Sequence, residues 1–215
     1  MAPRFRSVIL DADSTLCAVE GIDWLAGQRG PAVAARIVEV TERAMNGEIA
    51  LEAVYGARLE IVEPDAALIG RLSDVYLERL VPGAEEAVRT LTAAGVELAI
   101  ISGGIRQALL PLAVHLGVAA ERLRAVDIFL DDSGAYAGYD TRSPLATDTG
   151  KAAVAGELAM PRPTLMVGDG HTDLAARPSV DAFAAFVGVI RREPVVERAD
   201  YVISSFDQLT TLILS

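Results

Sequence analysis

Lysine, cysteine and aromatic residues are all scarce in this sequence. Lys151 is the only lysine among nineteen basic residues, which reflects either coding bias or a position that requires a compact ammonium. A single cysteine, Cys17, excludes an internal disulfide framework and is typical of a reducing compartment. Aromatic residues make up only 5% of the chain, so its core must be mostly aliphatic.

Long hydrophobic runs and basic clusters are also missing. Residues 1–10 carry two arginines and a short apolar run, too little for a signal peptide, and no later run reaches membrane-spanning length. Acidic residues outnumber basic ones by 30 to 19, giving a net charge of −11. Such a surface repels nucleic acids and anionic membranes. We therefore expect a soluble cytoplasmic protein that binds neither nucleic acid nor membrane.

The chain does contain enough apolar residues, 52%, for a substantial core. Its length corresponds to about 1.4 average domains, which suits one domain with an insertion. Short buried runs end abruptly at polar or glycine-rich residues, and helical patterns lie between them, as at 83–94 and 149–160. The predicted strands are 7–10, 96–101, 164–167, 182–187 and 201–203. This alternation predicts an α/β fold with a doubly wound, mainly parallel, Rossmann-like sheet, whose strands end at one common edge.

Residues 16–79 have a different pattern. Apolar side chains recur there at helical spacing, and no strand pattern interrupts them; such positions are Val33, Ile37, Val40, Ala44, Leu68, Leu72 and Val75. We predict a helical subdomain of residues 16–79 inserted into an α/β core of residues 1–15 plus 80–215. A turn at 131–134 between β-prone runs predicts a hairpin within 126–139.

Two pairs of carboxylates follow predicted strands. Asp11 and Asp13 come directly after the first strand, and Asp169 and Asp173 follow the strand that ends at residue 167. If these groups converge, each like-charge pair at ~4 Å costs roughly 4 kcal/mol at an effective dielectric constant of about 20. A hard divalent cation relieves that repulsion, and an all-oxygen ligand set indicates Mg²⁺.

A third strand end carries Ser102, Gly103 and Gly104, whose backbone amides can approach an anion closely. Each motif alone is a weak signal, because Asp-x-Asp usually marks a solvated turn and Ser-Gly-Gly an ordinary loop. Together, in this order and each at a strand end, the motifs form a strong signal of a functional site.

Two nucleotide-binding motifs can be excluded. Thr149-Gly150-Lys151 is similar to the end of a P-loop, but Leu145 replaces its first glycine and Ala152 its Ser or Thr. The segment that begins at Gly168 has Asp173 where the dinucleotide-binding fingerprint requires glycine.

Taken in order, the motifs resemble those of the haloacid dehalogenase (HAD)-like phosphatases, and most closely the phosphoserine phosphatase family. The resemblance extends from residue 8 to residue 209. It is carried by DADSTLCAVEGID at 11–23, RAMNG at 43–47, GAYAGYD at 134–140 and GDGHTD at 168–173, together with Ser-Gly-Gly and the lone lysine.

The resemblance implies a role for each motif residue. Asp11 would be the nucleophile that forms an aspartyl-phosphate. Asp13 would act first as an acid that protonates the leaving alkoxide and then as a base that activates water. Mg²⁺ would be held by the carboxylates of Asp11 and Asp169 and the carbonyl of Asp13, with Asp173 in support. The phosphoryl oxygens would be bound by Ser102, the Gly103 and Gly104 loop and Lys151.

The inserted helices resemble the substrate-selecting cap of this family. Glu20 would pair with a substrate ammonium, Arg58 would bind its carboxylate, and Met45 would lie near the entrance. The alternative is that Glu20 and Arg58 are ordinary solvated side chains. Leu51 and Leu145 depart from the family pattern, which commonly has phenylalanine and a hydroxyl residue there. The role of His171 is left open.

The expected function is therefore Mg²⁺-dependent hydrolysis of O-phospho-L-serine, a step of serine biosynthesis, by a phosphoric monoester hydrolase. The partner would be a small phosphorylated metabolite, and the enzyme a monomer or homodimer. The alternatives are a different small phosphomonoester, motivated by Leu51 and Leu145, a phosphotransferase, or a non-catalytic ligand-binding module.

Overall fold

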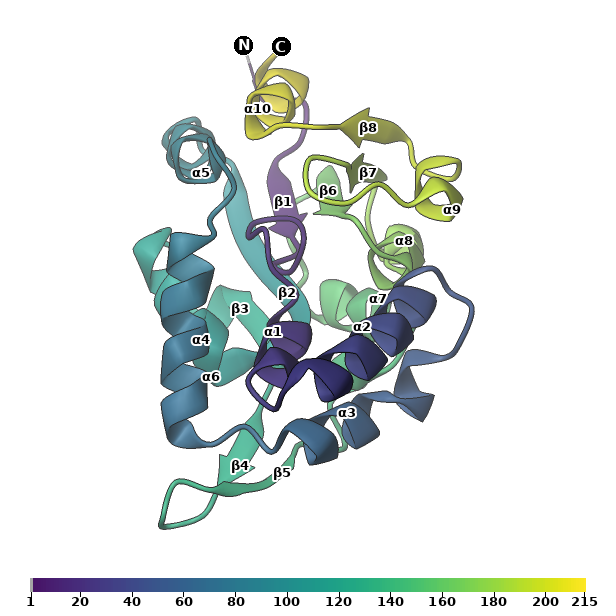
Figure 1. Ribbon diagram of the computed structural model, residues 1–215. Coiled ribbons are helices and arrows are strands. Elements are labelled where there is room, and N and C mark those ends of the chain that lie inside the picture. The colour runs from purple at the N-terminus through teal and green to yellow at the C-terminus, as the bar shows by residue number, and fades with distance from the viewer. Residues whose placement is uncertain (1) are drawn as a thin grey trace.

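The computed structural model describes residues 2–215, and its centre is a six-stranded sheet (Figure 1). The strand order is β3-β2-β1-β6-β7-β8, and every pair of neighbours is parallel. The strands are β1 (Ser7–Leu10), β2 (Glu97–Ile105), β3 (Leu123–Val126), β6 (Thr164–Gly168), β7 (Ala182–Phe186) and β8 (Tyr201–Ile203). The predicted fold class is confirmed.

Helices cover both faces of this sheet. As a result, β1, β6 and β7 have no exposed residue. Parallel crossovers are right-handed, so the reversal of strand order at β1 puts α5 on one face and α7 and α8 on the other. Helix α10 packs on α5, and α7 packs on α8. Their bounds are α5 (Ala84–Ala93), α6 (Arg106–His115), α7 (Gly150–Glu157), α8 (His171–Ala175), α9 (Glu193–Val196) and α10 (Phe206–Leu214).

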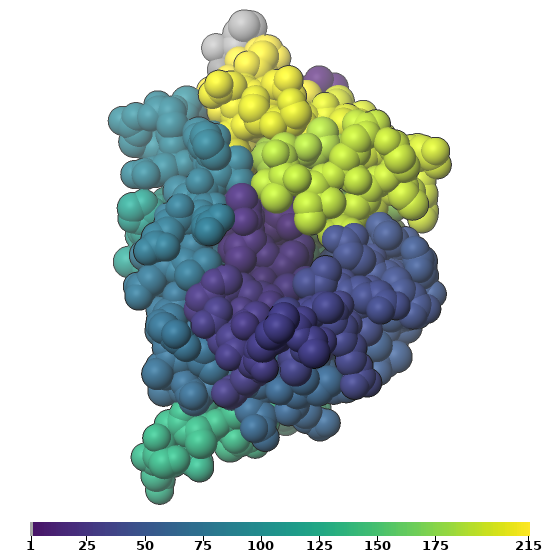
Figure 2. Space-filling model, viewed as in Figure 1, coloured from purple at the N-terminus to yellow at the C-terminus, as the bar shows by residue number. Residues whose placement is uncertain are grey.

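Between β1 and α5 the chain forms helices and, within the part that the structure describes, no strand. These helices are α1 (Gly21–Gly27), α2 (Pro31–Met45), α3 (Tyr55–Val62) and α4 (Ala66–Glu78), with a short 3₁₀ turn η1 at Leu51–Ala53. Helices α1 to α3 lie beyond the carboxyl end of β1, whereas α4 packs against α6 of the α/β core (Figure 1). On the face drawn in Figure 2, this purple and blue segment forms a continuous surface with the yellow-green C-terminal part.

The predicted hairpin is present as a separate antiparallel pair, β4 (Ile128–Leu130) and β5 (Tyr136–Tyr139). The remaining 3₁₀ turns are η2 (Ala120–Arg122), η3 (Pro144–Ala146) and η4 (Arg177–Ser179). Cys17 is buried and forms no disulfide. Among residues 2–215, no helix is both long and apolar enough to cross a membrane.

One strand differs from the sequence prediction. Ser102, Gly103 and Gly104 were expected in a loop after the second strand, but they lie within β2, which continues to Ile105. The pairing of β2 with β3 shifts register between Ile101 and Ile105. This irregularity lets backbone groups of the Ser-Gly-Gly segment leave the sheet ladder while the chain stays extended.

Candidate active site

The sheet brings Asp11 and Asp169 together because β1 and β6 are neighbours. The backbone N–H of Asp11 donates to Val167 O at 3.0 Å and so extends the pairing one residue beyond β1. Ser14 then adopts a left-handed φ of 52°, which turns the chain back after the two aspartates. The Thr15 hydroxyl donates to Asp169 Oδ1 at 3.3 Å. The two strand ends are thus tied to each other.

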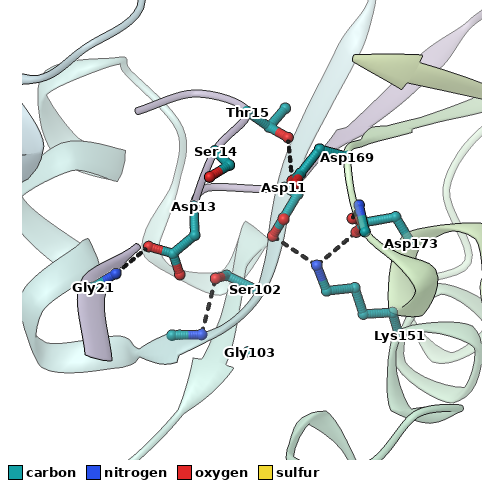
Figure 3. A network of polar contacts seen from close by, with 12 residues as sticks. Asp11, Asp13, Ser14, Thr15, Gly21, Ser102, Gly103, Lys151, Asp169 and Asp173 are labelled. Atoms are coloured by element: carbon teal, nitrogen blue, oxygen red, sulfur yellow. Dashed lines mark hydrogen bonds and ion pairs between the residues drawn. The ribbon is translucent and has the colours of Figure 1, made fainter. Parts of the chain in front are cut away.

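Lys151 lies between two carboxylates (Figure 3). Its Nζ is 2.7 Å from Asp11 Oδ1 and donates to Asp173 Oδ1 at 2.6 Å, and all three side chains are buried. Burial alone would lower the pKa of Lys151, but the ion pairs with Asp11 and Asp173 raise it above its ordinary value. The ammonium therefore stays charged at any physiological pH.

Two glycines allow the side chain of Asp173 to occupy this position. A Cβ at residue 168 would lie 2.1 Å from Cγ of Asp173, so only glycine leaves room for that side chain. The backbone N–H of Gly170 donates to Asp173 Oδ2 at 2.9 Å. The Gly168-Asp169-Gly170 motif therefore has a packing reason as well as a chemical one.

Asp11, Asp169 and Asp173 form a buried acidic cluster in which one oxygen of each lies within 4.8 Å of the others. Burial is the main reason that the pKa of Asp11 is raised well above its ordinary value, and the nearby Asp173 adds to it. Burial, again with Asp173, raises the pKa of Asp169 to about 6. Three crowded, desolvated carboxylates fit a hard divalent cation, which would relieve both effects.

Asp13 points away from this cluster. Its Oδ1 accepts hydrogen bonds from the Gly21 backbone N–H at 2.9 Å and from the Tyr76 hydroxyl at 2.8 Å. Burial raises the pKa of Asp13, although these two hydrogen bonds partly offset the effect. Its other oxygen, Oδ2, faces Gly104, where an added Cβ would lie only 3.0 Å from it. This carboxyl group is held in one orientation and is easier to protonate than an exposed one.

The Ser-Gly-Gly segment presents a hydroxyl and backbone amides beside the aspartates (Figure 3). The backbone N–H of Gly104 donates to Ser102 Oγ at 2.9 Å. Because Ser102 Oγ accepts this bond, its own hydrogen is left to donate elsewhere. Ser102 is 1% exposed and lines the same cavity as Asp11 and Asp13.

Glu20 and Arg58 reach the cavity from the inserted helical segment. Glu20 Oε1 accepts from the Ser14 hydroxyl at 2.6 Å, and burial, together with nearby Asp13, raises the pKa of Glu20 well above its ordinary value. Arg58 Nη1 donates to the Thr41 hydroxyl at 2.7 Å, which in turn donates to Asp23 at 2.5 Å. Within residues 2–215, the buried Arg58 Nε has no hydrogen-bond partner.

One cavity unites almost all the residues that the sequence predicted. Its volume is about 50 Å³, enough for a few water molecules. Asp173 is not in its lining but contacts Lys151, which is. The predicted residues that line it are Asp11, Asp13, Glu20, Met45, Arg58, Ser102, Gly103, Gly104, Lys151 and Asp169. Leu51 and Leu145, the two departures from the family pattern, also line it.

Several contacting residues were missed by sequence reasoning. Arg192, from the loop before α9, is 3% exposed; its Nε donates to Asp169 Oδ2 at 3.1 Å and its Nη1 to Glu42 of α2 at 2.9 Å. Nothing in the sequence around Arg192 indicates this position. Tyr55 also lines the cavity, and its place three residues before Arg58 on one helix is a signal that could have found it. His171, whose role the sequence left open, lies against the loop after α2, since a Cβ at Gly47 would be 2.9 Å from its Nδ1.

Comparison with known proteins identifies the family of the chain. A family model described as haloacid dehalogenase-like hydrolase matches residues 5–181. The chain is 37% identical to the chloroplastic phosphoserine phosphatase of Arabidopsis thaliana, covering 95% of this chain and 70% of that protein. It is 34% identical to the phosphoserine phosphatase of Rattus norvegicus, covering 94% and 91%.

A solved structure is similar over its whole length. It is a phosphoserine phosphohydrolase-like protein from Francisella tularensis, with a TM-score of 0.89 and 27% identity, covering 97% of this chain and all of that one. The chain therefore belongs to the haloacid dehalogenase-like hydrolases. Within them, the two sequence relatives named above are phosphoserine phosphatases.

Proposed function

We propose that this chain is a Mg²⁺-dependent phosphatase that hydrolyses O-phospho-L-serine to serine and phosphate. The observation that carries the proposal is the single cavity in which the Asp11–Lys151 pair faces Glu20 and Arg58 from the inserted helices. One side of that cavity suits a phosphoryl group, and the other suits the ammonium and carboxylate of an amino acid. The names of the sequence relatives support the same substrate.

Asp11 is the proposed nucleophile. Its carboxylate attacks phosphorus, the bond to the serine oxygen breaks, and an aspartyl-phosphate forms on Asp11. The bound Mg²⁺ would be held by Asp11, Asp169 and the carbonyl of Asp13, with Asp173 in support, and would supply positive charge at the phosphoryl oxygens. Lys151 and the Ser102 hydroxyl donate to the same oxygens.

Asp13 is the proposed acid and base. Its raised pKa keeps a proton available for the leaving serine oxygen, and Oδ2 is the free oxygen because Oδ1 already accepts two hydrogen bonds. Once deprotonated, Asp13 removes a proton from the water that attacks the aspartyl-phosphate. Phosphate then leaves, and both aspartates return to their starting states.

The helices of residues 16–79 form the proposed cap. They contribute Glu20, Met45 and Arg58 to the lining of the cavity, so we expect the cap to move as substrate enters and product leaves. Glu20 and Arg58 would bind the ammonium and the carboxylate, and Met45 packs near Gly170 at the edge. Leu51 and Leu145 favour a second candidate, another small phosphomonoester, because they put apolar surface into the same cavity.

The test measures phosphate release from O-phospho-L-serine and a panel of phosphothreonine, glycerol phosphate and an aryl phosphate, with Mg²⁺ and with EDTA. We expect phosphoserine to have the highest kcat/KM and EDTA to abolish turnover. Glu20→Gln and Arg58→Lys should each lower kcat/KM for phosphoserine roughly 10- to 100-fold, while the aryl phosphate rate changes little.

Glu39→Gln on the exposed face of α2 serves as the matched control, since it removes a carboxylate that does not line the cavity. A phosphoserine rate no better than that of the aryl phosphate would contradict the proposed substrate. Turnover that persists in EDTA would contradict the metal dependence.

A further inference from the structure

Tyr55 is a buried side chain at the start of α3 that the proposed mechanism does not use. It is 1% exposed, and its hydroxyl donates to the carbonyl oxygen of Gly103 at 2.7 Å. Its ring centroid lies 5.6 Å from Cζ of Arg58 and 5.4 Å from the ring of Tyr139 in β5. One side chain of the inserted helices thus contacts the Ser-Gly-Gly segment of the core directly.

The acceptor of this hydrogen bond belongs to a peptide group with a second role. The Gly103 carbonyl and the Gly104 N–H are the two ends of one peptide, and that N–H donates to Ser102 Oγ. Tyr55, the peptide and Ser102 therefore form a continuous chain of hydrogen bonds. A hydrogen bond accepted at the carbonyl fixes the peptide plane and strengthens its N–H as a donor.

The same helix turn carries Arg58. Residues three apart lie on one face of a helix, so Tyr55 and Arg58 move together when α3 moves. Arg58 faces the amino-acid end of the cavity, and Tyr55 contacts the segment at its phosphoryl end. Docking of α3 therefore acts on both ends of a bound substrate at once.

We infer that Tyr55 is a positioning residue that orients the Gly103–Gly104 peptide and the Ser102 hydroxyl for a phosphoryl group when α3 is docked. The inference rests on the proposed function, because it deepens the role of the same cavity. It assigns the docked helix a part in phosphoryl binding in addition to recognition of the amino-acid end.

Tyr55→Phe tests the inference, because it keeps the ring and removes only the hydroxyl. We expect orthovanadate, titrated calorimetrically in the presence of Mg²⁺, to bind roughly 10-fold more weakly, and kcat/KM to fall by a similar factor. Tyr139→Phe is the matched control: it removes the hydroxyl of the neighbouring tilted ring, which has no hydrogen-bond partner within residues 2–215. That variant should bind orthovanadate within about 2-fold of the parent protein.

A double-mutant cycle separates positioning from general stability. If Tyr55 acts through Ser102, the loss of orthovanadate affinity caused by Tyr55→Phe should shrink to about 2-fold or less in a Ser102→Ala background. Parent-like orthovanadate affinity in Tyr55→Phe, or fully additive losses in the double variant, would overturn the inference.

The titration also separates this inference from the proposed function. Orthovanadate contains no amino acid, so weaker binding by Tyr55→Phe supports the inference even if phosphoserine proves a poor substrate. Conversely, efficient phosphoserine hydrolysis combined with unchanged orthovanadate binding in Tyr55→Phe would overturn the inference and leave the proposed function standing.

Discussion

Lys151 is constrained on two sides, and its environment favours a compact cation. Its Nζ lies 2.7 Å from Asp11 and 2.6 Å from Asp173, and the residue is 5% exposed. A guanidinium is planar and broader than an ammonium, so it would have to displace one of these carboxylates. This geometry favours a chemical requirement over coding bias as the reason for lysine at this position.

Lys151→Arg should therefore lose most activity although it keeps the charge. We expect kcat for phosphate release to fall roughly 100-fold or more, with an unchanged circular dichroism spectrum. Arg89→Lys, on an exposed residue of α5, is the matched exchange and should leave kcat unchanged. Near-normal turnover in Lys151→Arg would contradict this requirement and leave coding bias as the explanation for the single lysine.

The sequence predicts the residues of short contiguous motifs better than those that act across the fold. Asp11, Ser102 and Asp169 each follow or end a predicted strand, and all line one cavity. Arg192 and Tyr55 reach the site only because distant segments pack together: Tyr55 is 48 residues from Gly103. The spacing of Tyr55 from Arg58 could have indicated that Tyr55 enters the cavity, but no local pattern encodes its contact with Gly103 or the contact of Arg192 with Asp169.

At the scale of elements, the start of α7 is packed tightly against η3. A Cβ at Gly150 would lie 1.7 Å from the carbonyl oxygen of Pro144. Gly150 precedes Lys151, and η3 contains Leu145, which lines the cavity. The contact between these two elements thus fixes the backbone that carries the lysine.

Gly150→Ala should force α7 and η3 apart. We expect the free energy of unfolding to fall by about 2 kcal/mol or more, and kcat to fall with it because Lys151 shifts. Gly156→Ala on the same helix is the control: the nearest atom to its Cβ is Ser179 Oγ at 3.9 Å, so the change should stabilise the protein by about 0.5–1 kcal/mol. Thermal unfolding measures both, and equal melting temperatures for the two variants would contradict this packing argument.

Five of the six strands of the sheet were predicted from the sequence. The bounds of β1 and β8 agree with the prediction, and β6 and β7 each differ by one residue at the end. Strand β3 was not predicted, because it lies at the edge of the sheet and alternates with the exposed Arg124 instead of forming a continuous apolar run. Continuous apolar runs leave a clear signal in the sequence, whereas a strand interrupted by an exposed arginine does not.

At the scale of the whole molecule, the acidic cluster couples stability to pH. Burial raises the pKa values of Asp11, Asp13, Glu20 and Asp169, so without metal the folded protein binds protons more tightly than the unfolded chain. The stability that these groups contribute is fully present below their unfolded values and is lost as the pH rises through their folded values. For Asp169 this window runs from its ordinary value of 3.8 to about 6.

We therefore expect the melting temperature of EDTA-treated protein to be several degrees lower at pH 7.5 than at pH 5. Mg²⁺ binds ionised carboxylates, so it should raise the melting temperature more at pH 7.5 than at pH 5. Differential scanning calorimetry at both pH values, with and without Mg²⁺, measures this. An equal rise in melting temperature on adding Mg²⁺ at the two pH values would contradict the coupling between the acidic cluster and the metal.

The position of β1 also determines when the site can form during synthesis. This first strand lies at the centre of the sheet, and Ser7 pairs with Glu97 on one side and Thr164 on the other. A nascent chain on the ribosome therefore cannot complete the surroundings of Asp11 until β6 has emerged. Until then an apolar strand stays without its partners, which makes the growing chain a candidate for chaperone binding.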